Sequence, residues 1–328
     1  MQRRKLVLSA LAMPFLAALP RAALADPGVL LDQAGALTQL RAIAIWQSGR
    51  EVAARGYRGF DPNRATNIKS ASKSVISALA GIAIQRGLFS GADQRVAAIL
   101  KNDLPANPDP RLRDLTLGNL LSMQAGLQRQ SGPNYGRWVG SRNWVRAALA
   151  VPFEQDPGGA MQYSTASTHL VSAMLTRASG RSTLDLAQDW LTMPGFRIAS
   201  WQRDPQGVYL GGNEMAMSTR SLLAFGAAYA AGGQGVIPPG WIADSWQVRT
   251  RSIFSGEAYG YGWFIGQAGG RPMRYGWGYG GQMIYVFPPA GGRPALAIAM
   301  TSDPDQPSGR TGYREQLNAL AGALAQAL

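Results

Sequence analysis

Two side chains three residues apart, Ser70 and Lys73, are the strongest candidates for covalent catalysis in this sequence. The residues after Ser70 have the apolar spacing of a helix, and residues three apart share one helix face, so the hydroxyl and the amine can touch. A serine hydroxyl needs a base to take its proton, and a lysine whose pKa is lowered by burial can be that base. We therefore expect Ser70 to be a nucleophile and Lys73 its base, with Lys69 flanking them on another part of the helix surface.

Lysine is rare in this chain, and its distribution supports the prediction. Of the 32 lysines and arginines 28 are arginines, which keep their proton and cannot act as bases. Two of the four lysines, Lys69 and Lys73, lie in this one segment. The spacing S-x-x-K also arises by chance, however, and Ser70 and Lys73 would then be ordinary residues of a helix. Other motifs must decide between these two interpretations.

A tyrosine and a glycine-rich segment further along the chain could complete such a site. Tyr163 follows a Pro-Gly turn and precedes a helical pattern. Its hydroxyl could bind Lys73 and Ser70 and relay a proton, although a half-buried tyrosine without that role would look the same. Residues 275–282 contain four glycines and lead into a strand-like segment, and glycines beside a strand let the backbone approach a ligand. An N–H of this segment and the N–H of Ser70 could together bind an oxyanion.

The apolar pattern predicts the elements that must hold these residues. Residues 40–55 predict a β-hairpin, and residues 70–83 predict a helix that ends near Gly87. Further helices are expected over 117–124, 143–150, 165–177, 183–190, 218–231 and 313–328, and strands over 261–267, 271–277, 282–287 and 294–301. This order predicts an α+β fold, in which an antiparallel sheet built from both ends of the chain is flanked by N- and C-terminal helices and carries an inserted all-helical domain.

The first 25 residues look like a cleavable signal peptide. They have a basic start, a short apolar run and Ala23-Leu24-Ala25 before Asp26. The apolar run is too short to span a bilayer. Arg3-Arg4 also permits export by the twin-arginine route, so the export route stays open. We expect a periplasmic or secreted protein without stable membrane insertion after signal cleavage.

The rest of the chain is expected to form two domains. Residues 26–90 and 247–328 make the sheet domain and residues 91–246 the helical one, with the active site between them. The net charge is +13 at pH 7, but the arginines are scattered, so we expect no nucleic-acid partner. One histidine, His169, and no cysteine leave too few ligands for a typical metal site, and we expect no metal and no cofactor.

The glycines at 276, 278 and 281 match a dinucleotide-binding motif. That motif needs a helix after it, whereas the residues that follow predict a strand. The sequence also lacks the G-x-S-x-G turn that carries the nucleophile of α/β-hydrolases. Neither fold is therefore expected.

Ser70 with Lys73, Tyr163 and the glycine-rich segment together resemble the serine β-lactamase and penicillin-binding-protein superfamily. The similarity is closest to its class C-like branch of esterases and 6-aminohexanoate-dimer hydrolases, and it covers about residues 42–303. The resemblance implies a β-lactamase/transpeptidase-like fold and a metal-independent serine hydrolase. It also implies an acyl-enzyme on Ser70, with the base and acid roles shared by Lys73 and Tyr163.

The same resemblance assigns the strand edge of the pocket. It implies that Tyr279, Gly280 and Gly281 line the pocket and that Gln282 supplies a backbone N–H to the oxyanion hole. β-Lactamases usually have Lys or His where this chain has Tyr279, and those cations help to hold the carboxylate of a β-lactam. Arg274 could compensate in part. The uncharged phenol favours a small carboxylic ester or amide as substrate.

Four further residues are candidates for the pocket: Thr165, Tyr135, Trp138 and Asn213. Thr165 stands where many relatives have Asn, and its hydroxyl offers a substrate amide fewer hydrogen bonds. The aromatic residues Tyr135 and Trp138 form either a wall of the pocket or part of the core. A β-lactamase or D-Ala-D-Ala carboxypeptidase remains an alternative function, and an inactive cell-wall or partner-binding module a second one.

Overall fold

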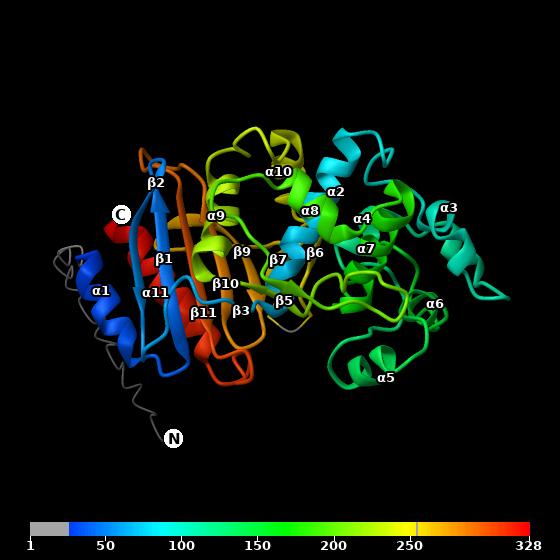
Figure 1. The fold of residues 1–328 in the computed structure, drawn as a ribbon, viewed down its shortest axis with the longest axis horizontal. Coiled ribbons are helices and arrows are strands. Elements are labelled where there is room, and N and C mark those ends of the chain that lie inside the picture. The colour runs from blue at the N-terminus through cyan, green and yellow to red at the C-terminus, as the bar shows by residue number, and fades with distance from the viewer. Residues whose placement is uncertain (1–25, 254) are drawn as a thin grey trace, which may run out of the picture.

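The computed structural model describes residues 26–253 and 255–328, so the expected signal peptide lies outside the described residues. An eight-stranded antiparallel sheet forms one side of the molecule, and most of the short helices gather on the other (Figure 1). The strands lie in the order β2-β1-β11-β10-β9-β8-β7-β6. They are β1 Leu40–Gln47, β2 Arg50–Gly56, β6 Thr250–Arg251, β7 Ala258–Tyr259, β8 Phe264–Ala268, β9 Arg271–Gly278, β10 Gln282–Phe287 and β11 Leu296–Ser302. The predicted α+β fold with a sheet built from both ends of the chain is confirmed.

Strands from the two ends of the chain meet inside this sheet. β1 pairs with β11, which places Ile43 opposite Met300 and Ile45 opposite Ile298. β10 and β11 are buried along their whole length. Strands covered on both faces need apolar residues at every position, which explains why these two sequences do not alternate.

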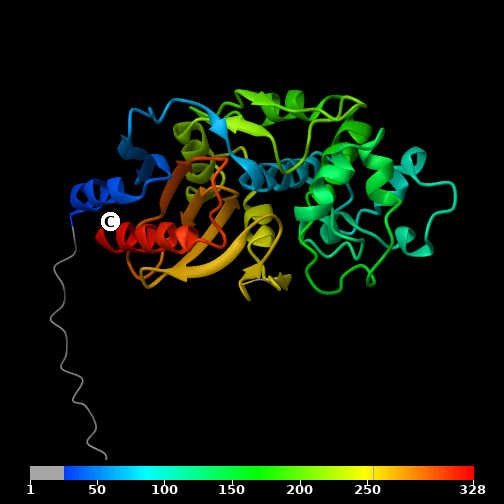
Figure 2. The same cartoon turned by 90° about the horizontal axis from the view of Figure 1, so that it is seen from below.

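Helices cover both faces of the sheet (Figure 2). On one face α11 (Tyr313–Ala327) packs on β8 and carries α1 (Pro27–Gln33). On the other face α9 (Thr219–Ala230) packs on β1, β10 and β11, and α2 (Ser72–Gln85) packs beside β9. The sheet and its helices thus make a core on each side.

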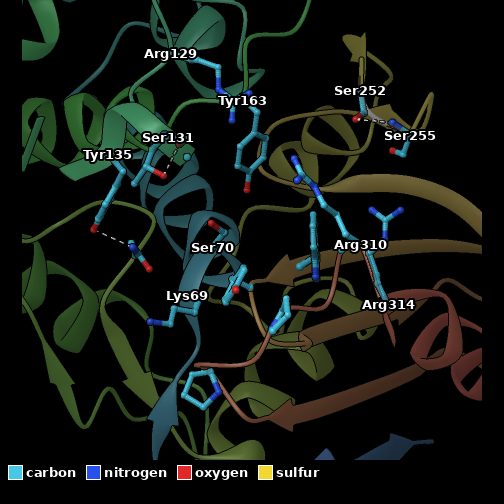
Figure 3. A pocket seen from close by; sticks show the side chains of 18 of the residues that line it. Lys69, Ser70, Arg129, Ser131, Tyr135, Tyr163, Ser252, Ser255, Arg310 and Arg314 are labelled. Atoms are coloured by element: carbon cyan, nitrogen blue, oxygen red, sulfur yellow. Dashed lines mark hydrogen bonds between the residues drawn. The ribbon is translucent and has the colours of Figure 1, made fainter. Parts of the chain in front are cut away.

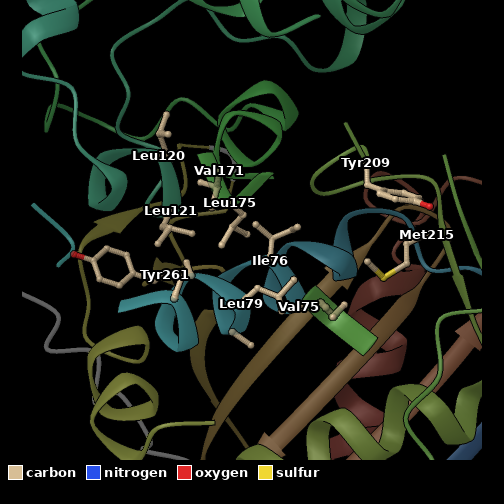
Figure 4. Close-up of a cluster of buried hydrophobic side chains, with 14 of the residues drawn as sticks. Val75, Ile76, Leu79, Leu120, Leu121, Val171, Leu175, Tyr209, Met215 and Tyr261 are labelled. Carbon is tan, nitrogen blue, oxygen red and sulfur yellow. The ribbon is translucent and has the colours of Figure 1, made fainter. Parts of the chain in front are cut away.

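Helix α2 runs from the sheet into the rest of the molecule and carries Lys73. Every residue from Ser72 to Ala83 is buried, so both sides of the helix are packed. Figure 4 shows the cluster around it, in which Val75, Ile76 and Leu79 lie near side chains of the inserted segment. Gly81 allows close packing here, because a Cβ would lie 2.1 Å from Cγ of Trp241. The helix that presents the candidate base is therefore held on all sides.

The inserted segment is mostly helical. Its α-helices are α3 Val96–Ile99, α4 Leu117–Leu121, α5 Tyr135–Val139, α6 Trp144–Leu149, α7 Thr165–Ser179, α8 Thr183–Trp190 and α10 Pro239–Ser245. The described chain as a whole also has five short 3₁₀ helices, at Ala34–Ala36, Lys69–Ala71, Lys101–Asp103, Pro110–Arg113 and Gly132–Asn134. The inserted segment also holds two short strands, β4 (Ser200–Trp201) and β5 (Met215–Met217), which form a second sheet with β3 (Thr66–Asn67). The insertion is therefore not the expected all-helical domain. Its strands could not be predicted, because strands of two or three residues are too short to show alternation in the sequence.

Two of the boundaries that differ from those expected have a structural reason. Helix α9 falls within residues 91–246 but packs on the large sheet, so we propose that the chain returns to the sheet domain there. The strand expected over 261–267 begins only at Phe264. Gly262 interrupts it, with φ +79° and a Cβ position only 3.0 Å from the carbonyl oxygen of Lys73. Within residues 26–253 and 255–328, no helix is both long and apolar enough to cross a membrane.

Candidate active site

Ser70 lies in a 3₁₀ turn, Lys69–Ala71, that leads directly into α2. The expected helix thus begins two residues later than Ser70. The preceding strand β3 fixes this turn, because Asn67 pairs with Ala216 of β5 and Ile68 N–H donates to the carbonyl of Met215 at 2.8 Å. Ser70 therefore lies just before the N-terminus of α2, with its hydroxyl in the cavity (Figure 3).

Lys73 is buried directly beneath Ser70. Its Nζ lies 3.1 Å from Oγ of Ser70, 3.3 Å from Oγ1 of Thr165 and 2.7 Å from the carbonyl oxygen of Gly212. Burial lowers the pKa of Lys73 from its ordinary 10.5 to about 7. A neutral amine has two hydrogens and one lone pair, so it can donate to Thr165 and Gly212 and accept the proton of Ser70.

Two successive glycines close the loop over Lys73. Gly212 has φ +87°, and a Cβ there would lie 2.3 Å from Oγ1 of Thr168 and 2.9 Å from Nζ of Lys73. At Gly211 a Cβ would lie 2.1 Å from the carbonyl oxygen of Thr168. Only glycine lets this loop approach closely enough to exclude water from the amine.

We expect Gly212→Ala to slow acylation of Ser70 and to destabilise the fold, because the added methyl group displaces the carbonyl that binds Lys73. Gly207→Ala is the matched control, since Gly207 also has a left-handed φ of +83° but open space around its Cβ position. The control should lose only the conformational term of about 1 kcal/mol. Thermal unfolding and the acylation rate measure the two effects. Equal behaviour of both variants would contradict the role given to the Gly212 contact.

Tyr163 approaches Ser70 from the side opposite Lys69, and its hydroxyl points toward Ser70 (Figure 3). The Nζ of Lys73 lies 5.1 Å from the centre of its ring. The ring also packs against Tyr259 and Phe264. Burial raises the pKa of Tyr163 to about 12, and a hydrogen bond with the Ser70 side chain opposes this rise. Tyr163 is therefore a neutral phenol at neutral pH.

The end of β9 passes directly beside the Ser70 turn. A Cβ at Gly276 would lie 2.7 Å from Oγ of Ser74, and one at Gly278 would lie 2.2 Å from the carbonyl oxygen of Ile68. Pairing of β9 with β8 ends at Tyr275. Beyond that residue, the edge of β9 is left open toward the nucleophile, and Trp277 lines the cavity there.

The strand register decides which N–H groups face this open edge. The carbonyl of Gly278 accepts from Gly281 N–H at 3.1 Å, so it points toward β10. Backbone groups of successive strand residues point to opposite sides, and the N–H and C=O of Trp277 therefore point away from β10. Gln282 pairs with Gly278 inside the sheet, and its side chain binds the backbone of Ser302. Gln282 thus lies inside the sheet, whereas Trp277 faces the open edge, so the expected position of Gln282 at the pocket is not supported.

These groups surround one cavity of about 960 Å³. Aromatic side chains of Tyr135, Tyr163, Phe264, Trp277 and Tyr279 line it. The polar and charged side chains that line it are Lys69, Ser70, Arg129, Ser131, Thr165, Asn213, Glu214, Ser252, Ser255, Asp305, Arg310 and Arg314. The cavity is large enough for a small organic substrate.

The family model for Beta-lactamase matches residues 37–323. The chain belongs to the β-lactamase family. Solved structures of the same fold include EstCE1, a hydrolase with promiscuous acyltransferase activity (TM-score 0.71, 18% identity, 92% of this chain and 97% of that one). A candidate 6-aminohexanoate-dimer hydrolase from Bacillus anthracis (0.71, 16%, 91% and 81%) and an octameric penicillin-binding protein homologue from Pyrococcus abyssi (0.68, 18%, 92% and 77%) are also similar. At these identities the likeness shows the fold alone.

A curated relative is a protein described as fimbrial assembly protein FimD, serogroup H1, of Dichelobacter nodosus. It is 27% identical over 169 residues, which are 48% of this chain and 42% of the relative. The match thus spans less than half of that protein's length. It adds a sequence relationship but no activity.

Within this family scaffold the predicted pocket residues separate into two groups. Tyr135 and Asn213 line the cavity, with Asn213 Nδ2 donating to the Tyr135 hydroxyl at 2.9 Å. Thr165 lines it too, but its hydroxyl is turned toward Lys73 and Ser131. Trp138 is only 2% exposed and packs against Trp144 and His169. It belongs to the core, so its assignment to the pocket is wrong.

The strand-edge residues separate in the same way. Tyr279 lies at the mouth with half of its surface exposed. Gly280 and Gly281 form the β9–β10 turn, with φ +84° and +93°, and they pack against Asp303 and Tyr313 rather than the cavity. Arg274 is also away from it, because it lies over Trp246. The expected pocket position of these two glycines and the compensating role of Arg274 are therefore not supported.

Ser131, Trp277 and Glu214 also line the cavity, although the sequence did not predict them there, and Lys69 was expected only to flank the site. Ser131 accepts the Thr165 N–H at 2.8 Å and so fixes the start of α7. Lys69 lines the cavity and pairs with Glu214 at 3.5 Å. For the Glu214 loop the signal was present, because consecutive glycines beside polar residues mark a close backbone approach.

Proposed function

We propose that the protein is a metal-independent serine hydrolase that cleaves a carboxylic ester or small amide through an acyl-enzyme on Ser70. One observation carries the proposal: the buried Nζ of Lys73, with a pKa of about 7, lies 3.1 Å from Oγ of Ser70. A lysine with that pKa is neutral in a large part of the molecules at neutral pH and can accept a proton. This is the condition under which a serine becomes a nucleophile.

Acylation begins when Lys73 takes the proton of Ser70 and Oγ attacks the substrate carbonyl carbon. Negative charge moves to the carbonyl oxygen, and we expect the N–H groups of Ser70 and Trp277 to bind it. Both are backbone donors held by packed elements, and fixed donors stabilise an oxyanion without reorganisation. The proposed oxyanion site therefore lies between the turn that carries Ser70 and the open edge of β9.

Tyr163 supplies the proton of the leaving group. Its pKa of about 12 keeps it protonated at neutral pH, and an alkoxide or amine anion is a stronger base than a phenolate. The tyrosine therefore donates as the carbon–oxygen or carbon–nitrogen bond breaks, and the protonated Lys73 beside it restores its proton. Water then attacks the acyl-enzyme with the same groups acting in reverse.

The mouth of the cavity supports an ester or small amide rather than a β-lactam. Tyr279 is uncharged and half exposed there, so its side chain offers no cation to a β-lactam carboxylate. Aromatic side chains on several sides favour an apolar acyl or leaving group. We further propose that the protein is exported to the periplasm or medium, which N-terminal sequencing of the mature protein tests.

A fluorophosphonate probe tests the proposal directly. We expect one adduct on Ser70 in intact-mass and peptide analysis, a burst with p-nitrophenyl acetate, and neither with Ser70→Ala. Ser72→Ala is the matched control, because Ser72 follows the Ser70 turn directly, as the first residue of α2, but its hydroxyl donates to the Lys69 carbonyl. A folded protein without any Ser70 adduct would support the inactive-module alternative. Rapid nitrocefin turnover or a stable penicillin adduct would favour the β-lactamase and carboxypeptidase alternatives.

A further inference from the structure

Three polar residues join the segment before the nucleophile to the loop over Lys73. Glu214 Oε2 accepts from Asn67 Nδ2 at 2.6 Å, and its Oε1 lies 3.5 Å from Nζ of Lys69. Asn67 Oδ1 in turn accepts the backbone N–H of Lys69 at 2.9 Å. We call Asn67, Lys69 and Glu214 the clamp. Its three contacts join β3, the turn that carries Ser70 and the loop of residues 211–214 to one another.

Both charged members of the clamp have a strained backbone. Lys69 has φ +50° and Glu214 has φ +49°, a left-handed conformation that costs residues other than glycine on the order of 1 kcal/mol each. Such strain persists only where the surrounding contacts enforce it. Here the two strained residues hold each other through their side chains, and both line the cavity beside Ser70.

The other end of the clamp reaches the base. Glu214 follows Gly212 by two residues, and Gly212 supplies the carbonyl that accepts from Nζ of Lys73 at 2.7 Å. The clamp therefore holds both the residue that precedes the nucleophile and the loop that covers the base. Neither Lys69 nor Glu214 needs to touch the substrate for this.

We propose that Glu214 is a positioning residue for the Ser70/Lys73 pair: through Asn67 and Lys69 it keeps the 211–214 loop closed over Lys73 and fixes the turn that carries Ser70. This inference rests on the proposed hydrolase function.

Among the described residues, the groups that contact Nζ of Lys73 are neutral. These are Ser70 from the turn before α2, Thr165 and the Tyr163 ring from the α7 side, and the Gly212 carbonyl from the loop. The nearby charged side chains, Lys69 and Glu214, pair with each other. The low pKa of Lys73 has burial as its cause, so it depends on the loop that keeps water away.

Loosening the clamp is therefore expected to change the pH dependence and not only the rate. When water reaches Lys73, its pKa rises back toward the ordinary lysine value, and a higher pH is needed to deprotonate it. Acylation that requires neutral Lys73 then reaches half of its maximum at a higher pH. A role in folding alone would lower the amount of active protein and leave that midpoint in place.

The test measures the rate of Ser70 acylation by a fluorophosphonate as a function of pH. In the full chain we expect a midpoint near the Lys73 pKa of about 7, and an alkaline shift of roughly one unit or more in Glu214→Gln and in Asn67→Ala. Glu51→Gln is the matched control, because Glu51 also forms an ion pair with a basic residue, Arg220 at 3.0 Å, but on the surface. The control should keep the wild-type midpoint.

The possible results separate the inference from the function on which it rests. An unchanged midpoint in both clamp variants, whether the rate falls or not, overturns the positioning role. If Glu214→Gln fails to fold, Asn67→Ala still decides, since it keeps the carboxylate and removes its hydrogen bond. Absence of a wild-type adduct on Ser70 refutes the proposed function itself. A normal wild-type adduct with unshifted variants refutes only the clamp.

Discussion

Replacing Lys73 by methionine is expected to slow acylation of Ser70 by about a thousandfold or more, because the loss of a general base and of nucleophile activation are both of that order. Methionine keeps the length and the apolar stem of the side chain but accepts no proton. Lys73→Arg should be as slow, since a guanidinium stays protonated. The fluorophosphonate rate, measured under single-turnover conditions, reports this step alone.

The same substitution, Lys73→Met, should slow acylation without lowering the free energy of unfolding. Burial without a counter-ion lowers the pKa of Lys73 in the folded state to about 7, whereas the unfolded chain keeps the ordinary value. Between these two values the unfolded state binds more protons, so the wild-type free energy of unfolding rises with pH through this window. Lys73→Met removes the cost of burying the amine. We expect the variant to be at least as stable as the wild type, with the largest gain below pH 7.

Lys101→Met is the control for both measurements. Lys101 is exposed and lies in a short 3₁₀ helix of the insertion. It should leave acylation and stability nearly unchanged. A Lys73→Met protein that acylates within about tenfold of the wild type would mean that another group is the base. An inactive variant that is also strongly destabilised would show that Lys73 is needed for folding instead.

The parts of the site that depend on local spacing were predictable from the sequence. Ser70 and Lys73 are neighbours because one helical turn separates them, and β10 has the predicted bounds because an apolar run between a glycine turn and two prolines can hardly be another element. The β1–β2 hairpin is equally local. Its turn residues Ser48 and Gly49 both have positive φ, as a two-residue hairpin loop requires.

The parts that depend on register and packing were not predictable. Trp277 rather than Gln282 faces the open edge of β9 because of the turn at Gly280 and Gly281, and one residue of register reverses every backbone group. Trp138 of α5 is in the core because it packs against Trp144 of α6 and His169 of α7, which no local pattern encodes. The clamp joins residues 147 positions apart, and its geometry exists only after folding.

Replacing Tyr163 by phenylalanine should have an effect that depends on the leaving group. The ring still packs against Tyr259 and Phe264, so the change removes only the hydroxyl and with it the proposed proton donor. An alkyl ester or an anilide needs that proton, and its acylation should slow by about 10²- to 10⁴-fold. The burst with p-nitrophenyl acetate should slow far less, because nitrophenolate is a stable anion that leaves without protonation.

Tyr259→Phe is the matched control for this prediction. Tyr259 is buried, lies edge-to-face with Tyr163 and does not line the cavity, so its hydroxyl should have no effect on either substrate. Equal losses with the activated and the unactivated ester in Tyr163→Phe would mean that the phenol acts before the leaving group departs, as a base or an orienting group for Ser70. A loss confined to the unactivated substrates would assign the proton donation to Tyr163 and leave Lys73 as the resting base.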